Sequence, residues 1–206
     1  ERDKDVANAI IYAVDNGAKV INMSFGKYWT PNKDYVDAAI KYAQSKDVLL
    51  VHAAGNDAKN KDEEDSYPTR ILNNKEVAPN WIEVGASSSS KSPKSLIADF
   101  SNYGATTVDF FAPGVDIYST VPDYSYENAS GTSMACPAAA GVAALIRSYF
   151  PELTAVQVRE VLMATTTKYN KKVTAPNGEK LKMSELCITG GFVNAANAVN
   201  YLLEKK

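Results

Sequence analysis

Histidine and cysteine are scarce in this sequence. Its 206 residues include one histidine, His52, and two cysteines, Cys136 and Cys187. The two cysteines lie far apart and neither belongs to a Cys-x-x-Cys motif, which excludes both a zinc signature and a disulfide framework. We therefore expect two separate thiols. Many secreted proteins lack disulfides, so this expectation leaves the redox compartment open.

The sequence also lacks a long apolar run and an excess of charge. No run approaches the roughly 20 apolar residues needed to span a bilayer, and residues 1–5, Glu-Arg-Asp-Lys-Asp, do not have a signal-peptide layout. With 22 basic and 24 acidic residues, the net charge of −2 gives no reason to expect nucleic acid or an anionic membrane as a partner. The length and the 45% apolar content favour one soluble domain, residues 1–206.

The first half of the chain alternates between helical and strand patterns. Apolar residues recur at helical spacing over residues 6–14 and 35–43, and short apolar runs follow them at residues 20–25 and 48–54. A third apolar run, residues 81–86, fits another buried strand. Helices that alternate with buried strands predict an α/β fold with a mainly parallel sheet between layers of helices.

The second half begins with an apolar step into a turn at residues 110–114. An alanine-rich helix is expected over residues 132–150, with Pro137 in its first turns, where proline is tolerated. Thr154 and Gln157 have the spacing of a capping box and predict the start of the next helix. The remaining predictions are loops at residues 57–65 and 87–95, a surface excursion at residues 168–182 and a final helix over residues 193–203.

The segment Gly-Thr-Ser-Met-Ala-Cys-Pro, residues 131–137, places Ser133 at the start of the long helix. The N-terminus of a helix has unpaired backbone N–H groups and a positive dipole end, which favour a developing oxyanion. A serine nucleophile is one interpretation, and a simple N-cap by Ser133 or Thr132 is the other. The segment is not Gly-x-Ser-x-Gly, which disfavours a nucleophile elbow of the α/β-hydrolase type.

Two more segments place polar groups after predicted strands, where α/β sheets bind ligands. The segment Ala53-Ala54-Gly55-Asn56 ends in a side-chain amide, a neutral donor that could stabilise an oxyanion without becoming protonated. Gly-Asn alone is more often a turn. The segment Asn-Met-Ser-Phe-Gly, residues 22–26, could offer backbone groups to an extended peptide, or could be only a core strand.

Together and in this order, these three segments resemble the subtilase family of serine proteases (subtilisin-like, peptidase S8). The resemblance is strongest at Gly-Thr-Ser-Met-Ala and also includes residues 20–26, 111–114 and 191–195. It implies the C-terminal part of a subtilase catalytic domain. The implied fold is a three-layer α/β sandwich with a mainly parallel central sheet, from which the N-terminal strands are missing.

The resemblance also implies roles for individual residues. Ser133 would be the nucleophile of a serine endopeptidase, and Asn56 would donate to the oxyanion together with the Ser133 backbone N–H. Ser24, Phe25 and Gly26 would line the substrate backbone. Ala53, Ala54 and Gly55 would form the wall of the pocket for the side chain before the scissile bond. The implied partner is a polypeptide substrate, and the implied location is extracellular or in the cell envelope.

The chain itself offers no counterpart to the Asp and His that complete a subtilase triad. Asp3, Asp5 and Asp15 do not lie in the family's Asp-[Ser/Thr]-Gly context. His52 lacks a His-Gly-Thr context and falls in a predicted buried strand, which favours a structural role. We therefore expect the Asp and His upstream of this sequence and expect the chain alone to be inactive. The alternatives are a degenerate protease fold kept as a binding or structural module and, less favoured, a Ser-Lys hydrolase.

Three further expectations concern ions and surfaces. Many subtilases bind calcium, but Asp99, Asp109 and Asp116 form no ligand-spaced run. Calcium binding is therefore left open but unsupported, no metal ligand is predicted and no cofactor is certain. Asp57 could favour basic side chains at the pocket rim, although an exposed loop acid is the simpler role. A parallel sheet without its N-terminal strands would have an open edge and an uncovered apolar face, which predicts self-association.

Overall fold

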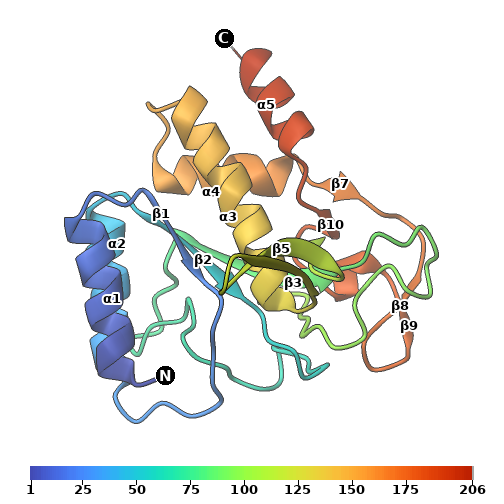
Figure 1. Ribbon diagram of the computed structural model, residues 1–206, viewed down its shortest axis with the longest axis horizontal. Coiled ribbons are helices and arrows are strands. Elements are labelled where there is room, and N and C mark those ends of the chain that lie inside the picture. The colour runs from blue at the N-terminus through green and yellow to red at the C-terminus, as the bar shows by residue number, and fades with distance from the viewer. Residues whose placement is uncertain (206) are drawn as a thin grey trace.

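A computed structural model describes residues 1–205, and its centre is a six-stranded sheet (Figure 1). The strand order is β1-β2-β3-β4-β10-β7, and every pairing is parallel except that of β10 with β7. The strands are β1 (Val20–Met23), β2 (Leu49–Ala53), β3 (Trp81–Ser87), β4 (Phe110–Pro113), β10 (Gly191–Phe192) and β7 (Thr167–Lys168). The predicted α/β class with a mainly parallel sheet is confirmed.

Helices cover both faces of this sheet. The helices α1 (Asp3–Asp15) and α2 (Lys33–Ser45) pack on one face, and α3 (Thr132–Tyr149), α4 (Ala155–Ala164) and α5 (Ala195–Leu203) pack on the other (Figure 1). Because successive strand residues point to opposite faces, Leu49 and Val51 join the core with α3, while Leu50 joins the core with α1 and α2. All residues of β2 and β3 are buried. This explains why these strands are continuous apolar runs in the sequence.

The predicted helix start at Thr154 is confirmed. The Thr154 hydroxyl accepts from the Gln157 N–H at 3.2 Å, and the Gln157 side chain accepts from the Thr154 N–H at 2.9 Å. This reciprocal pair satisfies backbone donors that have no partner within the helix. It fixes the residue at which α4 begins.

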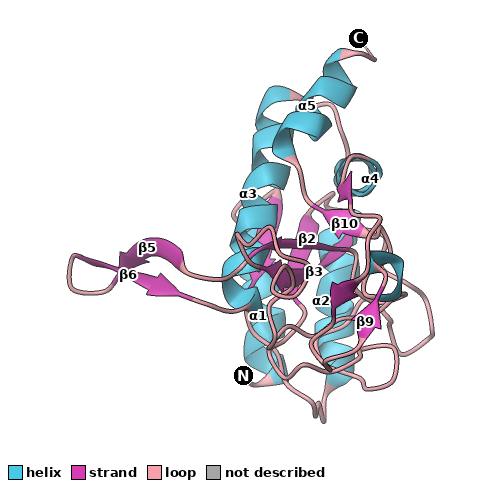
Figure 2. Cartoon of the chain, turned by 90° about the vertical axis from the view of Figure 1, so that its right-hand side faces the viewer, coloured by secondary structure: helices cyan, strands magenta, loops and turns pink. Residues whose placement is uncertain are grey.

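The chain between β4 and α3 contains a feature that the sequence did not predict. The strands β5 (Ile117–Val121) and β6 (Ser125–Ala129) form an antiparallel hairpin that projects away from the layered body (Figure 2). Most of its residues are exposed and polar. A strand with two solvated faces lacks the alternation of apolar and polar residues that indicates a half-buried strand, so the sequence pattern does not reveal it. The apolar step predicted at residues 110–114 is β4 followed by the turn.

The surface excursion predicted at residues 168–182 is only partly correct. It contains the small hairpin of β8 (Val173–Thr174) and β9 (Lys180–Leu181), and a short 3-10 helix, Met183–Glu185, follows it. Val173 and Ala175 are buried in a third core cluster that also contains Phe111. Part of this segment therefore packs in a core cluster with Phe111 of β4 and does not lie on the surface.

Cys136 and Cys187 are separate, buried thiols, as predicted. Burial raises the pKa of Cys136 to about 12, so this thiol stays protonated. Among residues 1–205, no helix is both long enough and apolar enough to cross a bilayer.

Candidate active site

Ser133 lies in the first turn of α3, and Pro137, four residues later, leaves the Ser133 carbonyl without its usual helical hydrogen bond. Pro137 has no N–H, so it cannot make the usual helical hydrogen bond to the Ser133 carbonyl. The Ser24 hydroxyl donates to this free carbonyl instead, at 2.9 Å. The Ser133 hydroxyl lies 3.3 Å from the Ser24 carbonyl in return. The segment after β1 and the start of α3 are thus joined at the predicted nucleophile.

Asn56 is oriented by Thr132. The Thr132 backbone N–H and the Thr132 hydroxyl both donate to Asn56 Oδ1, each at 2.8 Å. A backbone N–H can only donate, so the amide must present its oxygen to Thr132 and its Nδ2 group away from it. In the part of the chain that the structure describes, Asn56 Nδ2 has no hydrogen-bond partner. It is free to donate to a ligand beside Ser133.

Asn102 organises the turn that carries Asn56, a role the sequence did not predict. Its side chain is fully buried; its Nδ2 donates to the Ala54 carbonyl at 2.9 Å and its Oδ1 accepts from the Asp57 and Lys59 N–H groups. Gly55 fits here because its φ of +107° suits glycine, and an added Cβ would lie 2.3 Å from Asn102 Nδ2. The only sequence signal was a polar pair, Ser101-Asn102, next to an apolar segment.

A cavity of about 300 Å³ adjoins Ser133 and Asn56. Of the predicted substrate-binding residues, five line it and Ser24 does not; the five are Phe25, Gly26, Ala53, Ala54 and Gly55. Ser24 instead contacts Ser133 directly. The structure therefore brings all eight predicted site residues to one place, from segments that are far apart in the sequence.

The rim of this cavity carries a polar pair. The Tyr28 hydroxyl donates to Asp57 at 2.6 Å, and the Lys59 ammonium lies 4.3 Å from the centre of the Tyr28 ring. Burial and then the neighbouring Asp57 carboxylate raise the pKa of Tyr28. Asp57 is exposed, as the simpler interpretation predicted, and it is already engaged by a neutral donor.

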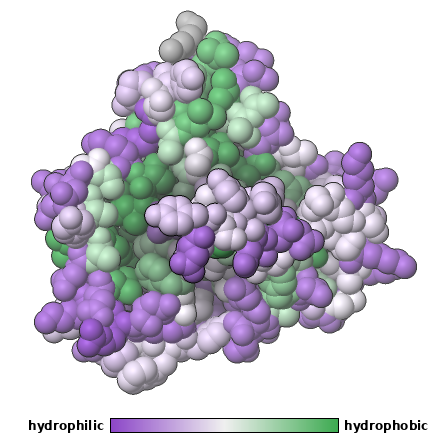
Figure 3. Space-filling model, in the orientation of Figure 1, coloured by the Kyte–Doolittle hydropathy of each residue, from purple (hydrophilic) through white to green (hydrophobic). Residues whose placement is uncertain are grey.

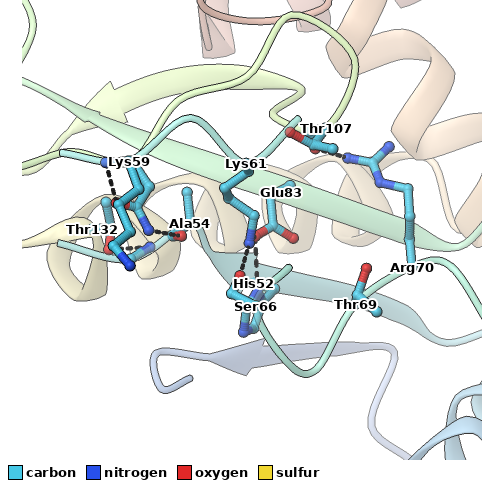
Figure 4. A network of polar contacts seen from close by, with 12 residues as sticks. His52, Ala54, Lys59, Lys61, Ser66, Thr69, Arg70, Glu83, Thr107 and Thr132 are labelled. Atoms are coloured by element: carbon cyan, nitrogen blue, oxygen red, sulfur yellow. Dashed lines mark hydrogen bonds and ion pairs between the residues drawn. The ribbon is translucent and has the colours of Figure 1, made fainter. Parts of the chain in front are cut away.

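His52 is buried below the cavity and is not a base for Ser133. Figure 4 shows His52 beside Glu83; Nδ1 lies 3.0 Å from Glu83 Oε1. The other ring nitrogen, Nε2, lies 2.8 Å from the Phe25 carbonyl. Lys61 Nζ and Trp81 Nε1 also contact the Glu83 carboxylate, both at 2.7 Å. Although burial alone would raise it, the Lys61 and His52 neighbours lower the pKa of Glu83 to about 2. The structural role predicted for His52 is consistent with this network.

Ser133 has no base beside it in the described residues, 1–205. Its hydroxyl contacts only the Ser24 carbonyl, and no histidine or lysine side chain is hydrogen-bonded to it. Within the same residues, no group of three or more His, Cys, Asp or Glu side chains is arranged to hold a metal ion. The chain thus presents a serine and an amide donor without the group that would activate the serine.

Comparison with known sequences defines the class. The subtilase family (Peptidase_S8) profile matches residues 2–181. The chain is 37% identical to a thermophilic serine proteinase of Bacillus sp. strain AK1 over 198 residues, which are 96% of this chain and 41% of that protein. It is also 37% identical to subtilisin DY of Bacillus licheniformis over 163 residues, 79% of this chain and 54% of that one. The chain belongs to the subtilase family, as its motifs indicated.

Comparison with solved structures agrees. The chain matches the prenylagaramide maturation protease PagA with a TM-score of 0.76 and 30% identity, over 97% of this chain and 68% of that one. It matches a cold-adapted subtilisin-like serine proteinase with a TM-score of 0.67 and 29% identity, over 91% of this chain and 58% of that one. The chain spans about half the length of the curated relatives it matches.

Proposed function

We propose that the protein containing this chain is a serine endopeptidase that hydrolyses polypeptides through an acyl-enzyme. Ser133 attacks the scissile carbonyl, and the Asn56 amide and the Ser133 backbone N–H donate to the oxyanion that forms. The substrate chain lies along Ser24, Phe25 and Gly26. The side chain before the scissile bond enters the cavity of about 300 Å³.

The observation that carries this proposal is the orientation of Asn56. Two donors of Thr132 hold the Asn56 amide oxygen, and within residues 1–205 the amide nitrogen has no hydrogen-bond partner, in a residue that lines the cavity. A donor that is already oriented stabilises developing charge without the free-energy cost of reorganisation. A fold retained only for packing does not require an unpaired amide beside a serine at a helix N-terminus.

The proposal requires a general base, and residues 1–205 do not place one at Ser133. The sole histidine is occupied by Glu83 and the Phe25 carbonyl. We therefore propose that the Asp and His of the triad come from outside this sequence, and that the chain alone has negligible peptidase activity, because triad members act as a unit.

A peptide-binding module without catalytic activity is the second candidate. It is favoured by the lack of a general base beside the Ser133 hydroxyl within residues 1–205. The same cavity and the same free amide could hold an extended peptide without cleaving it. The two candidates differ in whether Ser133 is reactive in the full-length protein.

A fluorophosphonate probe distinguishes these candidates. We expect the full-length protein to become labelled at Ser133, the Ser133→Ala variant to remain unlabelled, and the isolated 206-residue chain to label at a rate close to that of free serine. Absence of labelling in a folded full-length protein would refute the peptidase and leave peptide binding as the function.

The resemblance also supports a location outside the cytoplasm, in the extracellular space or the cell envelope. Fractionation of the producing cells, with an antibody against this chain, tests this location directly. Recovery of the protein only with cytoplasmic markers would contradict it.

A further inference from the structure

A cluster of buried and largely buried polar side chains adjoins the candidate substrate cavity. It consists of His52 on β2, Glu83 on β3, and Lys61 and Ser66 from the loop between these strands (Figure 4). His52 and Ser66 also line the cavity itself. The mechanism proposed above uses none of these groups, although His52 contacts the Phe25 backbone, which belongs to the proposed substrate-binding segment.

The hydrogen-bond partners of His52 determine where its ring protons must be. The Phe25 carbonyl can only accept, and it lies 2.8 Å from Nε2. Glu83 is a carboxylate that also receives Lys61 Nζ and Trp81 Nε1, so it too is an acceptor, 3.0 Å from Nδ1. A neutral imidazole has one donor and would direct a lone pair at one of these oxygens. Only a ring with hydrogens on both nitrogens satisfies both contacts.

We propose that His52 is a positioning residue, an imidazolium that ties the Phe25 carbonyl to the buried Glu83 carboxylate and so holds the substrate-binding segment in place. The assignment to substrate binding rests on the proposed function. The hydrogen-bonding state of the ring does not, because it follows from the geometry of this chain alone.

Two charged groups lie beside the His52 ring and act in opposite directions. The Glu83 carboxylate on β3 favours an imidazolium, whereas the Lys61 ammonium, which shares that carboxylate through a side chain only 8% exposed, opposes it, so the proposal rests on the hydrogen-bond geometry. The nearest titratable group from α3 is Cys136, whose burial raises its pKa to about 12 and keeps it neutral. Hydrogen bonds between charged partners are stronger than neutral ones, which gives the contact to Phe25 a larger effect on segment order.

The contact is made at the carbonyl one residue beyond the one that Ser133 contacts. The Ser24 carbonyl faces Ser133, whereas the next carbonyl, that of Phe25, is held by His52. Two residues further on, Lys27 exchanges backbone hydrogen bonds with Tyr67, at 2.9 and 2.8 Å. Gly26, between these two anchors, is exposed and lines the cavity. Its backbone position therefore depends on His52 from one side and on Tyr67 from the other.

The single histidine makes the first test unambiguous. In the ¹⁵N-labelled 206-residue chain, a long-range ¹H–¹⁵N correlation spectrum at pH 7 should show one histidine ring with both nitrogens protonated. In Glu83→Gln, the ring should lose the Nδ1 hydrogen and keep the Nε2 hydrogen that binds Phe25. An unprotonated Nε2 in the wild type, or two protonated nitrogens in Glu83→Gln, would overturn the assignment.

The second test asks whether the contact orders the segment. Hydrogen exchange of the Lys27 amide reports on segment opening, and we expect it to accelerate about tenfold in His52→Leu, the effect of losing one charge-assisted hydrogen bond. Trp81→Phe is the matched control, because it removes a donor to Glu83 and keeps an aromatic ring beside His52. Equal acceleration in both variants, or none in His52→Leu, would show that His52 is ordinary core.

The third test connects the contact to substrate. In the full-length protein, His52→Leu should raise KM for an extended peptide about tenfold and change kcat less than threefold, since Ser133 and Asn56 are untouched. An unchanged KM would overturn the positioning role. A full-length wild type that cleaves no peptide would refute the proposed function instead, and the ring spectra and Lys27 exchange would still decide the role of His52.

Discussion

The two ends of the Asn56 amide have different surroundings. The oxygen accepts hydrogen bonds from two donors of Thr132, whereas the nitrogen has no partner within residues 1–205, in a residue that lines the cavity. Because Thr132 is the residue before Ser133, the candidate nucleophile and the candidate oxyanion donor are fixed to each other through one short segment of chain. At the residue scale, catalysis would therefore depend on the Thr132–Asn56 contact as well as on Ser133.

Asn56→Ala removes the free amide donor. We expect kcat of the full-length protein to fall by about 10²–10³ with little change in KM, a range taken over from the measured loss of one oxyanion donor in a subtilisin. Steady-state kinetics on a peptide substrate measure the effect. Asn16→Ala, at the end of α1 and away from the site, is the control and should retain wild-type kcat. A loss of less than threefold in Asn56→Ala would mean that this amide does not contact the oxyanion.

Thr132→Val removes the hydroxyl that contacts Asn56 and leaves the backbone donor in place. One hydrogen bond contributes about 1 kcal/mol, so kcat should fall by about fivefold, much less than in Asn56→Ala. Thr165→Val is a matched control, since it removes a buried hydrogen bond from a threonine hydroxyl to the Val161 carbonyl, outside the candidate site. If both threonine variants lower kcat equally, the cause is lost stability and not the orientation of Asn56.

At the element scale, the carboxyl ends of β1 and β2 and the N-terminus of α3 meet at the site. Parallel strands place the segment after β1 next to the turn after β2, and α3 packs across both strands. This arrangement brings Ser24, Asn56 and Ser133 together although each belongs to a different element. Glu83 links β3 to β2 through His52 below the same site.

Acid should weaken the link between β2 and β3. The pKa of Glu83 is about 2 in the fold against 4.5 for the free group. A depressed carboxyl pKa contributes stability that is fully present above pH 4.5 and is lost as pH falls toward 2. The shift corresponds to a contribution on the order of 3 kcal/mol at neutral pH.

Urea unfolding of the wild type and Glu83→Gln from pH 7 to pH 2.5 measures this contribution. The difference in free energy of unfolding between the two should be largest at pH 7 and should shrink below pH 4.5. Glu64→Gln is the control at an exposed ion pair, where pH should have little effect on the difference. A difference for Glu83→Gln that does not change with pH would contradict the assignment of a buried carboxylate.

At the scale of the whole molecule, two surfaces lack a covering layer within residues 1–205. β1 pairs only with β2, so one of its edges has no neighbouring strand. Hydrophobic side chains also gather on the face seen in Figure 3, from α5 at the top down toward the hollow beside the β5–β6 hairpin. The exposed apolar side chains of the α3 and α5 region include Leu145, Tyr149 and Leu203, at 41%, 70% and 57% exposure.

We expect the 206-residue chain to self-associate through these surfaces, because open strand edges and large apolar patches pair readily. Light scattering coupled to size exclusion should give a mass above that of the 22.3 kDa monomer, increasing with concentration. Leu145→Glu together with Tyr149→Glu should lower that mass, whereas Tyr12→Glu on α1 should not. A monomeric wild type at working concentration would refute the prediction.

The sequence could predict much of the fold because its signals are local. Buried parallel strands are largely apolar, and helices repeat apolar residues at their own period, so β1, β2, β3 and α1 to α3 were identified correctly. The polar β5–β6 hairpin was missed for the same reason, since solvated strands carry no apolar period. The third core under residues 173–175 was missed because the burial of short strands depends on what packs over them.

The sequence by itself determined the family and the identity of Ser133 and Asn56 as candidate site residues, because the family signature lies in short contiguous segments. Only the tertiary structure decided how Thr132 orients Asn56, how Asn102 holds its turn, and what His52 contacts. These contacts join residues from separate strands and loops, and a single sequence contains no periodic signal for such pairs. His52 was predicted to be structural from its apolar neighbours, but its two acceptors, Glu83 and the Phe25 carbonyl, became visible only when the strands were assembled.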